Sequence, residues 1–440
     1  MGETNWAGNH GYAAEAVLTP RTTEEVRAAV EAATTVKALG SRHCFNDIAD
    51  APGGVLLDLS ALNTGSLENP VEINAEAATV TVGGSARYGD FVGQLHEAGF
   101  ALPNLASLPH ITVAGSVATG THGSGRRLQG LASAVSALEL VTADGGLRTF
   151  SREADPDVFP GLVVGLGALG VVTRLTLDVV PTFEVRQNVF EGLPWTAVHQ
   201  HFDEIEDAGY SVSLFTDWTG DRIDQVWVKS RVEPGAPVTA LPGLHGAVPA
   251  DRPRHPVAAA GVPAVHCTPQ LGVPGPWHER LPHFALAFTP SVGEELQSEY
   301  FVPYGDAVAA IEAVRGLGDQ LAPVLLVCEI RAIAGDDLWL SPSHGGDRVA
   351  LHFTWRPRQP EVEALLPLLE ERLAPFGARP HWGKLFHSSA LSGHYPRMAD
   401  FRALAHDLDP GGKFRTPFIR RTVFGEAGIR LQNRPPHHTP

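Results

Sequence analysis

Two short segments in the last third of the chain place polar side chains at alternating positions among apolar ones. The segment LLVCEIRA carries Glu329 and Arg331, and the segment VALHFTW carries His352 and Thr354. Side chains alternate between the two faces of a β-strand, so each segment predicts a strand with a polar pair on one face. Together these groups could bind hydroxyl groups and move a proton. The alternative is a pair of half-exposed strands with a solvent salt bridge.

The same alternation assigns the other side chains of these strands. Cys328 falls on the face opposite Glu329, which predicts a core thiol rather than a nucleophile. In full, we expect Leu325 and Val327 to share the face of Glu329 and Arg331, Cys328 and Ile330 to lie opposite, Val349, Leu351, Phe353 and Trp355 to face the core, and Ala350, His352 and Thr354 to face away from it.

Residues 107–125 (SLPHITVAGSVATGTHGSG) combine glycine with small hydroxyl side chains. A backbone of this kind can approach a ligand closely and direct several N–H groups at an anion, which favours a cofactor cradle over a surface turn. Residues 165–170 (GLGALG) match G-x-G-x-x-G, but residues 171–177 (VVTRLTL) alternate as a strand. A dinucleotide site of the Rossmann type needs a helix there, so we reject that interpretation.

Composition excludes several classes of function. The 440 residues contain 33 Lys and Arg against 49 Asp and Glu, a net charge of −16, with only four lysines. Such a chain is a poor partner for nucleic acid or an anionic membrane. Three scattered cysteines do not form a disulfide framework or a zinc site, so no metal is expected. The N-terminus lacks the apolar run of a signal peptide, which predicts a cytoplasmic protein.

Periodicity and capping signals predict an α+β fold. Between residues 233 and 282 the chain is rich in Pro, Gly and Ala and shows little periodicity, and we expect it to cover the active site. Helices are predicted at 22–33, 88–98 and 398–408, and strands at 36–39, 55–57, 71–82, 135–142, 171–179, 325–332 and 349–355.

The chain resembles the FAD flavoproteins of the vanillyl-alcohol-oxidase type, in particular the alditol oxidase (xylitol/sorbitol oxidase) branch, beside the sugar-lactone oxidases. The resemblance runs from about residue 5 to residue 420. Its most specific part is the segment 107–125. The other matching segments are 41–50 (SRHCFNDIAD), 297–303 (QSEYFVP), 329–331 (EIR), 351–355 (LHFTW), 382–384 (WGK) and 409–414 (DPGGKF).

The resemblance implies two domains and one cofactor. An FAD-binding domain would span 1–183 and be completed by 387–432, a substrate-binding (cap) domain with a large antiparallel sheet would span 184–386, and 433–440 would be a disordered tail. His43 falls where relatives attach the flavin covalently, and Cys44 replaces their usual serine, so a single link is implied. The implied FAD contacts are Leu39, Gly40, Ser41, Arg42, His43, Cys44, Ser107, Thr112, Gly115, Ser116, Thr119, Gly120, Thr121, His122, Val171, Val172 and Lys384.

The implied reaction is FAD-dependent oxidation of a terminal hydroxyl of an alditol to an aldose, with O₂ reduced to H₂O₂. A polyol offers only hydroxyls, so its site needs dense donors and acceptors. The expected substrate-binding residues are Ser107, Gln297, Glu329, Arg331 and Thr354, and the expected catalytic residues are Glu329, Arg331, His352 and Lys384.

Three choices stay open. The base is His352 or Lys384, and Lys384 could instead hold the flavin edge. A sugar-1,4-lactone oxidase or dehydrogenase is the alternative activity, and a flavin-fold protein used only for binding is a third. The expected partners are a small polyol and O₂, with no nucleic acid and no membrane, and the chain is expected to be a monomer.

Overall fold

A computed structural model of the chain describes residues 3–62, 71–233, 243–257, 263–288, 295–388 and 391–426. The predicted disordered tail, 433–440, lies outside these residues. The helices are α1 (Thr23–Ala32), α2 (Tyr88–Glu97), α3 (Val113–Ala118), α4 (Phe159–Val163), α5 (Trp195–Glu206), α6 (Ala307–Arg315), α7 (Gly318–Leu321), α8 (Gln359–Leu373), α9 (Met398–Leu408) and α10 (Pro417–Thr422).

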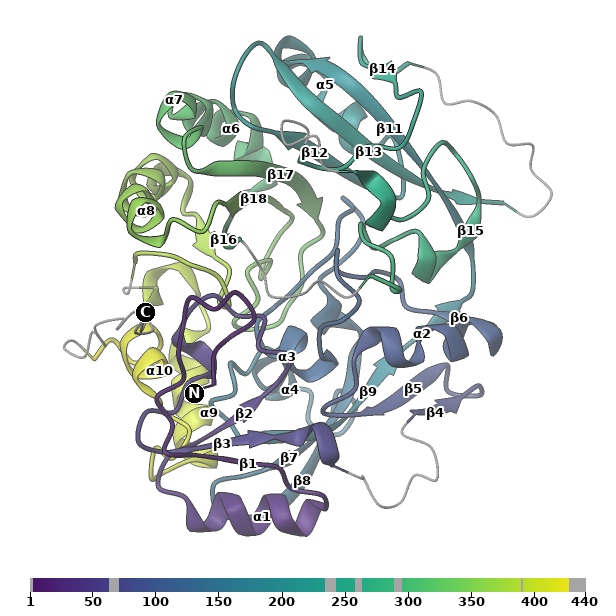
Figure 1. The fold of residues 1–440 in the computed structure, drawn as a ribbon. Helices are drawn as coiled ribbons and strands as arrows, with labels where there is room; N and C mark the ends of the chain where they lie inside the picture. Colours follow the sequence, from purple (N-terminus) through teal and green to yellow (C-terminus); the bar gives the residue numbers. More distant parts are fainter. Residues whose placement is uncertain are drawn as a thin grey trace, which may run out of the picture.

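The first part of the chain forms two small sheets (Figure 1). One is parallel, in the order β1–β3–β2, and the other is antiparallel, in the order β4–β5–β9–β7–β8. β6 and β10 pair separately. The strands are β1 (Ala16–Leu18), β2 (Val36–Leu39), β3 (Val55–Asp58), β4 (Val71–Asn74), β5 (Thr79–Gly83), β6 (Phe100–Ala101), β7 (Val135–Val141), β8 (Leu147–Ser151), β9 (Val171–Asp178) and β10 (Val180–Pro181).

A large antiparallel sheet follows, in the order β14–β11–β13–β12–β17–β18–β16–β19, with β15 also paired to β11. This sheet carries the two polar strands of the sequence analysis side by side, as β17 and β18. Its strands are β11 (Glu184–Pro194), β12 (Ser211–Thr216), β13 (Arg222–Val232), β14 (Val248–Pro249), β15 (Gly275–Pro276), β16 (Leu296–Pro303), β17 (Leu325–Ile333), β18 (Arg348–Trp355) and β19 (Arg379–Pro380).

Helices cover one face of the large sheet. Figure 1 shows α5, α6 and α8 beside the strands of this sheet. Ile205 of α5, Ile311 of α6 and Leu366 of α8 share one buried cluster with Leu351 and Phe353 of β18. Full burial of one such side chain contributes about 1.5–3 kcal/mol, so this face is a true core. The opposite face of β16, β17 and β18 is left to carry the polar residues.

The C-terminal helices return to the first part of the chain. Phe401 of α9 and Ile419 of α10 pack in one cluster with Val80, Phe91 and Leu175. The segment after the DPGGKF motif forms the helix α10. The C-terminal helices thus pack on the first part of the chain, and the domain boundaries stay a prediction.

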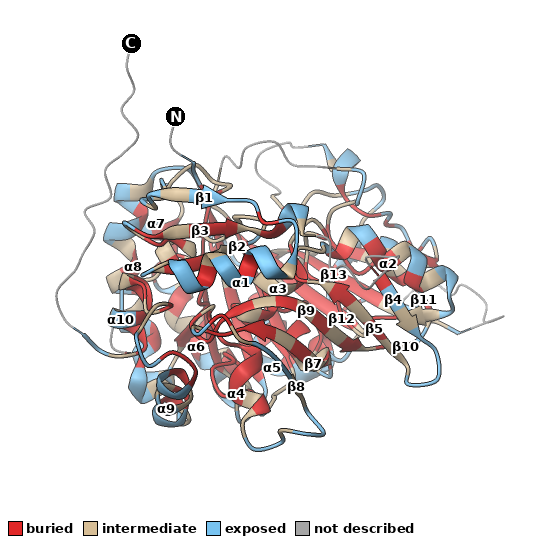
Figure 2. Ribbon diagram, turned by 90° about the horizontal axis from the view of Figure 1, so that it is seen from below, coloured by how far each residue is buried: buried red, intermediate tan, exposed pale blue. Residues whose placement is uncertain are grey.

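Local signals in the sequence predict most elements closely. Thr22 caps α1 by accepting a hydrogen bond from the Glu25 N–H, and the apolar stripe of α1 faces inward while its charged side is exposed (Figure 2). The G-x-G-x-x-G segment leads into strand β9 and not into a helix, which confirms the rejection of a Rossmann site.

One helix was not predicted, and two predictions are corrected. Residues 71–82, predicted as a strand, form β4 and β5, which pair as a hairpin around a turn at 75–78. The glycine-rich segment contains a short helix, α3, with Val113 and Val117 buried. An irregularity of β17 between Leu325 and Val327 moves Leu325 to the face of Cys328, where it joins the core. The remaining assignments of side chains to faces agree with the structure, and Cys328 is fully buried.

Candidate active site

A cavity of about 710 Å³ lies between the first part of the chain and the polar face of the large sheet. Ligand pockets usually have volumes of roughly 300–1,000 Å³. The predicted site residues that line it are Leu39, Gly40, Ser41, Arg42, His43, Cys44, Ser107, Thr112, Gly115, Ser116, Thr119, Thr121, His122, Val172, Gln297, Glu329, Arg331, His352, Thr354 and Lys384.

Two predicted cofactor contacts, Gly120 and Val171, do not line this cavity. Gly120 turns the chain with φ +68°, and a Cβ there would lie 2.8 Å from Cδ of Pro342. Val171 is fully buried in a small cluster with Phe414. Gly120 and Val171 therefore lie behind the residues that form the cavity surface.

The loop at 39–44 and the start of α3 form a tight cradle. A Cβ at Gly40 would lie only 2.6 Å from Oγ1 of Thr112 and 3.8 Å from Cα of Gly115, so Gly40 allows the loop to approach the start of α3 closely. A Cβ at Gly115 would lie 2.7 Å from the same Thr112 oxygen, so Gly115 leaves room for that hydroxyl. The Thr112 hydroxyl is buried and has no partner within the described structure. A cradle of close backbone and an unpaired buried hydroxyl fits a cofactor with phosphate and hydroxyl groups.

His43 lies beside Trp6, with ring centroids 4.3 Å apart, and lines the cavity. Burial, aided by the charge of Lys384, lowers the pKa of His43 to about 4, so its imidazole is neutral and keeps a nucleophilic nitrogen. Burial raises the pKa of the neighbouring Cys44 thiol to about 11, so that thiol is unreactive. The pair therefore offers one nucleophile, at residue 43.

Hydrogen bonds to the other side of the cavity hold the His43 loop. The Phe45 N–H donates to the Gly383 carbonyl at 2.7 Å. The Asn46 amide donates to the carbonyls of Trp382 and Lys384 at 2.9 and 2.7 Å. These hydrogen bonds thus join the loop that holds His43 to the turn that holds Lys384.

Glu299 of β16 is a buried carboxylate that the sequence analysis missed. It accepts hydrogen bonds from three side chains. Lys384 Nζ lies 2.6 Å from its Oε2, while Arg331 Nη2 and His122 Nε2 lie 2.9 and 3.0 Å from its Oε1. Burial opposes ionisation, but Lys384, His122 and Arg331 outweigh it and hold the pKa of Glu299 well below its usual range. Glu299 therefore fixes the positions of Lys384 and Arg331.

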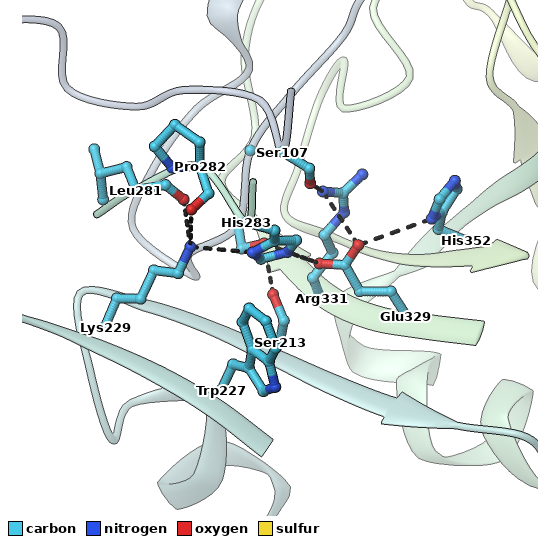
Figure 3. Close-up of polar contacts among 12 residues, drawn as sticks. Ser107, Ser213, Trp227, Lys229, Leu281, Pro282, His283, Glu329, Arg331 and His352 are labelled. Carbon is cyan, nitrogen blue, oxygen red and sulfur yellow. Dashed lines mark hydrogen bonds and ion pairs between the residues drawn. The ribbon is translucent and has the colours of Figure 1, made fainter. Parts of the chain in front are cut away.

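Glu329 is held differently on its two oxygens. Oε1 accepts a hydrogen bond of 2.9 Å from His283 Nε2, and Oε2 lies 3.6 Å from Arg331 Nη1 and 3.8 Å from His352 Nδ1 (Figure 3). Burial would raise the pKa of Glu329, but Arg331 and His283 hold it well below its usual range. Glu329 is thus an ionised carboxylate whose Oε2 faces Arg331 and His352, two side chains that line the cavity.

His352 is a neutral acceptor. Burial and the charge of Lys384 lower the pKa of His352 to about 3. Its Nε2 lies 3.1 Å from the amide oxygen of Gln297, which places the proton on Nε2 and leaves the Nδ1 lone pair toward Glu329. Gln297 is held in turn by Glu295, whose carboxylate accepts from its amide at 2.7 Å.

The segment with low periodicity contributes to the cavity wall. His255, Pro256 and Val257, from within residues 233–282, line it, and its stretches 234–242 and 258–262 lie outside the described residues. Phe284 and Phe288 continue the same wall beyond that segment. The role of the segment as a cover stays a prediction.

Several lining residues had no assigned role in the sequence analysis. The alternation from Gln297 along β16 would have placed Glu299 on the same face, so its signal was present. His283, His381 and Lys37 carried no such signal, because their contacts come from distant segments.

Among the described residues, one group, His201, Glu204 and His245, brings three potential metal ligands together. The two imidazole rings stack, with centroids 4.3 Å apart and an interplanar angle of 16°. Nitrogen lone pairs lie in the ring planes, so parallel stacked rings do not direct both at one ion. No helix in the described part of the chain is both long and apolar enough to span a bilayer.

Comparisons with known proteins identify the family of the chain. An FAD binding domain model matches residues 14–151, and a D-arabinono-1,4-lactone oxidase model matches residues 292–422. Two solved cholesterol oxidases share the fold: one from B. sterolicum with a TM-score of 0.72 and 16% identity over 96% of both chains, and a solvent-stable one with a TM-score of 0.75 and 18% identity over 96% of this chain and 97% of the other. The fold and site define a two-domain FAD flavoprotein of the vanillyl-alcohol-oxidase type.

The sequence relatives narrow the class. An alditol oxidase from Streptomyces sp. is 51% identical over 96% of this chain and 99% of its own length. More distant are an L-gulono-1,4-lactone dehydrogenase from Mycobacterium tuberculosis, at 26% over 96% and 98%, and the L-gulonolactone oxidase of Bos taurus, at 24% over 96% and 98%. The chain belongs to the alditol oxidase branch of these flavoproteins.

Proposed function

We propose that this protein oxidises a terminal hydroxyl of an alditol, such as xylitol or sorbitol, to the aldose. The observation that carries the proposal is the concentration of hydroxyl-binding side chains on one face of β16, β17 and β18, in the same cavity as the His43 loop. Bound FAD would accept a hydride from the carbinol carbon while the hydroxyl proton passes to a base, and the two electrons, together with two protons, would then reduce dioxygen to hydrogen peroxide.

Substrate binding depends on groups that are ordered before the substrate arrives. The Arg331 guanidinium is fixed by Glu299 and can donate in a fork to vicinal hydroxyls, while Glu329 Oε2 accepts from a hydroxyl. Ser107 lies 3.5 Å from Arg331 Nη1 and adds a hydroxyl to the same side. The full set that we assign to the substrate is Ser107, Gln297, Glu329, Arg331 and Thr354.

The hydroxyl proton needs an acceptor near the reacting carbon. His352 Nδ1 and Glu329 Oε2, 3.8 Å apart, form an acceptor pair, and we assign His352 as the base with Glu329 orienting the hydroxyl. Burial lowers the pKa of Lys384, but Glu299 lies 2.6 Å from its Nζ and favours the ammonium form, so Lys384 is the less favoured base. Lys384 instead places a positive charge at the border between the substrate groups and the His43 loop.

On the cofactor side, the neutral His43 imidazole is the proposed site of a single covalent flavin link. The other residues proposed to hold FAD are the cavity-lining members of 39–44 and 112–122, together with Val172. We retain the domain boundaries 1–183 with 387–432, and 184–386. The monomeric state and the cytoplasmic location stay predictions.

The decisive measurement is flavin reduction without oxygen. Purified holoprotein under nitrogen is mixed in turn with xylitol, sorbitol, an aldono-1,4-lactone and a simple diol, and the loss of the yellow flavin absorbance is timed. We expect the alditols to reduce the flavin fastest and air to yield peroxide. Faster reduction by the lactone would show that the protein is a lactone oxidase or dehydrogenase. No reduction by any compound would show that the protein only binds its ligand.

A further inference from the structure

A buried lysine of the substrate side has three hydrogen-bond partners and no contact with the proposed substrate groups. Lys229 of β13 is 1% exposed, and its Nζ lies within hydrogen-bond distance of the Leu281 carbonyl, at 3.1 Å from the Pro282 carbonyl and at 3.0 Å from Nδ1 of His283 (Figure 3). An ammonium group has three N–H donors, and three acceptors face it. The geometry therefore suits the charged form, although burial lowers the pKa of Lys229 to about 7.

This contact determines which nitrogen of His283 carries the proton. An ammonium can only donate, so Nδ1 accepts from Lys229 and the single imidazole proton lies on Nε2. Nε2 is 2.9 Å from Glu329 Oε1 and donates to it. Burial and the charge of Lys229 lower the pKa of His283 to about 4, so the ring stays neutral with this tautomer.

Aromatic packing fixes the plane of the ring. The His283 ring meets Trp227 edge-on, with centroids 5.2 Å apart and an angle of 75°, and Phe215 in the same manner at 5.6 Å and 70°. Phe215 and Trp227 also contact each other, with centroids 5.3 Å apart, so the three rings pack as one cluster that restricts rotation of the imidazole. Ser124, at 3.5 Å, is the other hydrogen-bond donor to Glu329 Oε1 within the described residues.

The same segment also contacts the loop that carries Ser107. The backbone N–H groups of His283 and Phe284 lie 3.1 and 3.3 Å from the Ser107 carbonyl, and both donate to it. Residues 281–284 therefore connect two groups of the proposed substrate set, Glu329 through a side chain and Ser107 through its backbone. Lys229 holds the start of this connection in place.

We propose that Lys229 and His283 are positioning residues for the oxidation. Together they hold Glu329 as an ionised acceptor whose Oε2 is directed at the substrate hydroxyl, and they fix the distance between Glu329 and Ser107. This inference rests on the proposed function, because it assigns a role toward the same alditol. Lys229 does not line the cavity, and His283, which does line it, is assigned a role through Glu329.

Three variants of the holoenzyme test the proposal. His283→Leu removes the donor to Glu329, His283→Gln keeps an N–H donor at a similar reach, and Lys229→Met leaves the tautomer of His283 unfixed. Anaerobic flavin reduction by xylitol should slow by about 10- to 100-fold in His283→Leu and Lys229→Met, the scale on which supporting hydrogen bonds act, and should largely recover in His283→Gln. Lys413→Met is the matched control, because Lys413 also donates to two backbone carbonyls but lies outside the cavity.

The pH profile separates positioning from a general loss of structure. Arg331 and His352 remain beside Glu329 in every variant, so an upward shift of the acidic limb of kcat/KM, by about one pH unit or more, reports the lost donor from His283. His283→Gln should keep the limb of the unmodified enzyme. An unmoved limb in His283→Leu, or equal rates in all variants, would overturn the proposal.

Crystal structures of the holoenzyme and of Lys229→Met provide a readout that does not depend on turnover. We expect the Glu329 carboxylate to leave the 2.9 Å contact with His283 in the variant. An unchanged carboxylate would refute the positioning role even if no polyol is oxidised. Absence of flavin reduction in the unmodified enzyme would instead refute the proposed function, so the two failures are distinguishable.

Discussion

Arg331 and Glu299 form an ion pair of 2.9 Å across an intervening strand, since β17 and β16 both flank β18. Arg331 is 5% exposed and Glu299 1%, so water screens neither charge. Buried pairs of this kind do little for net stability, yet removing one partner leaves an unpaired charge in a poor solvent. The pair is better understood as a device that orders the cavity before the substrate binds.

Glu299→Gln should therefore destabilise the protein. The substitution leaves Arg331 and Lys384 without their shared carboxylate, which typically costs about 3–5 kcal/mol in unfolding free energy. The shift of the urea unfolding midpoint measures it. Asp178→Asn, which breaks the exposed pair with Arg152, is the control and should cost about 0–1 kcal/mol. Equal shifts in the two variants would contradict the ordering role of Glu299.

Glu329→Gln and Arg331→Ala should each lower kcat/KM for xylitol by about 100-fold or more, because one removes a charged acceptor and the other a forked donor. Arg331→Lys keeps the charge without the fork and should recover only part of the loss. Glu206→Gln is the control, since Glu206 is equally buried on α5 outside the cavity. Full activity in Glu329→Gln would remove Glu329 from the substrate set.

His43→Ala should release the flavin from its covalent link. After acid precipitation the pellet of the unmodified holoprotein should be yellow, whereas the pellet of the variant should be colourless with FAD in the supernatant. Cys44→Ser should leave the pellet yellow, because burial raises the pKa of that thiol and keeps it unreactive. A colourless pellet from fully loaded unmodified protein would mean that no link forms.

Glu206 should make the stability depend on pH. Burial is the main reason that the pKa of Glu206 rises from its ordinary value of 4.5 to about 8 in the folded chain. As the pH rises, Glu206 loses its proton at a lower pH in the unfolded chain than in the folded chain. Its contribution to the free energy of unfolding is therefore fully present below about pH 4.5 and is lost as the pH rises toward 8. Glu206→Gln should therefore gain stability relative to the parent across this range, by up to a few kcal/mol. Parallel stability–pH curves would show that Glu206 ionises normally.

The sequence predicted the polar faces of β17 and β18 well, because strand alternation is a strong local signal. It predicted the wrong face for Leu325, since an irregular register is set by the neighbouring strand and not by the local pattern. Helix α3 was missed because glycine and valine have low helix propensity, and burial of Val113 and Val117 stabilises it instead.

The residues that support Glu329 from behind, Lys229 and His283, could not be predicted from local sequence patterns. Lys229 and His283 meet across 54 positions of the chain, through a segment with little periodicity. Only the folded packing of Trp227 and Phe215 against the imidazole shows why that histidine belongs to the site. Glu299 is the intermediate case, because its alternation with Gln297 was visible but its partners were not.

The hydrogen bonds from Phe45 and Asn46 to residues 382–384 also bear on biogenesis. Polypeptides emerge from the ribosome from the N-terminus, and early portions often fold before later ones are made. Here the loop that would receive the flavin cannot take its final shape until translation has passed Lys384. Capture of the coenzyme should thus be a late event, and a prematurely terminated chain should emerge colourless.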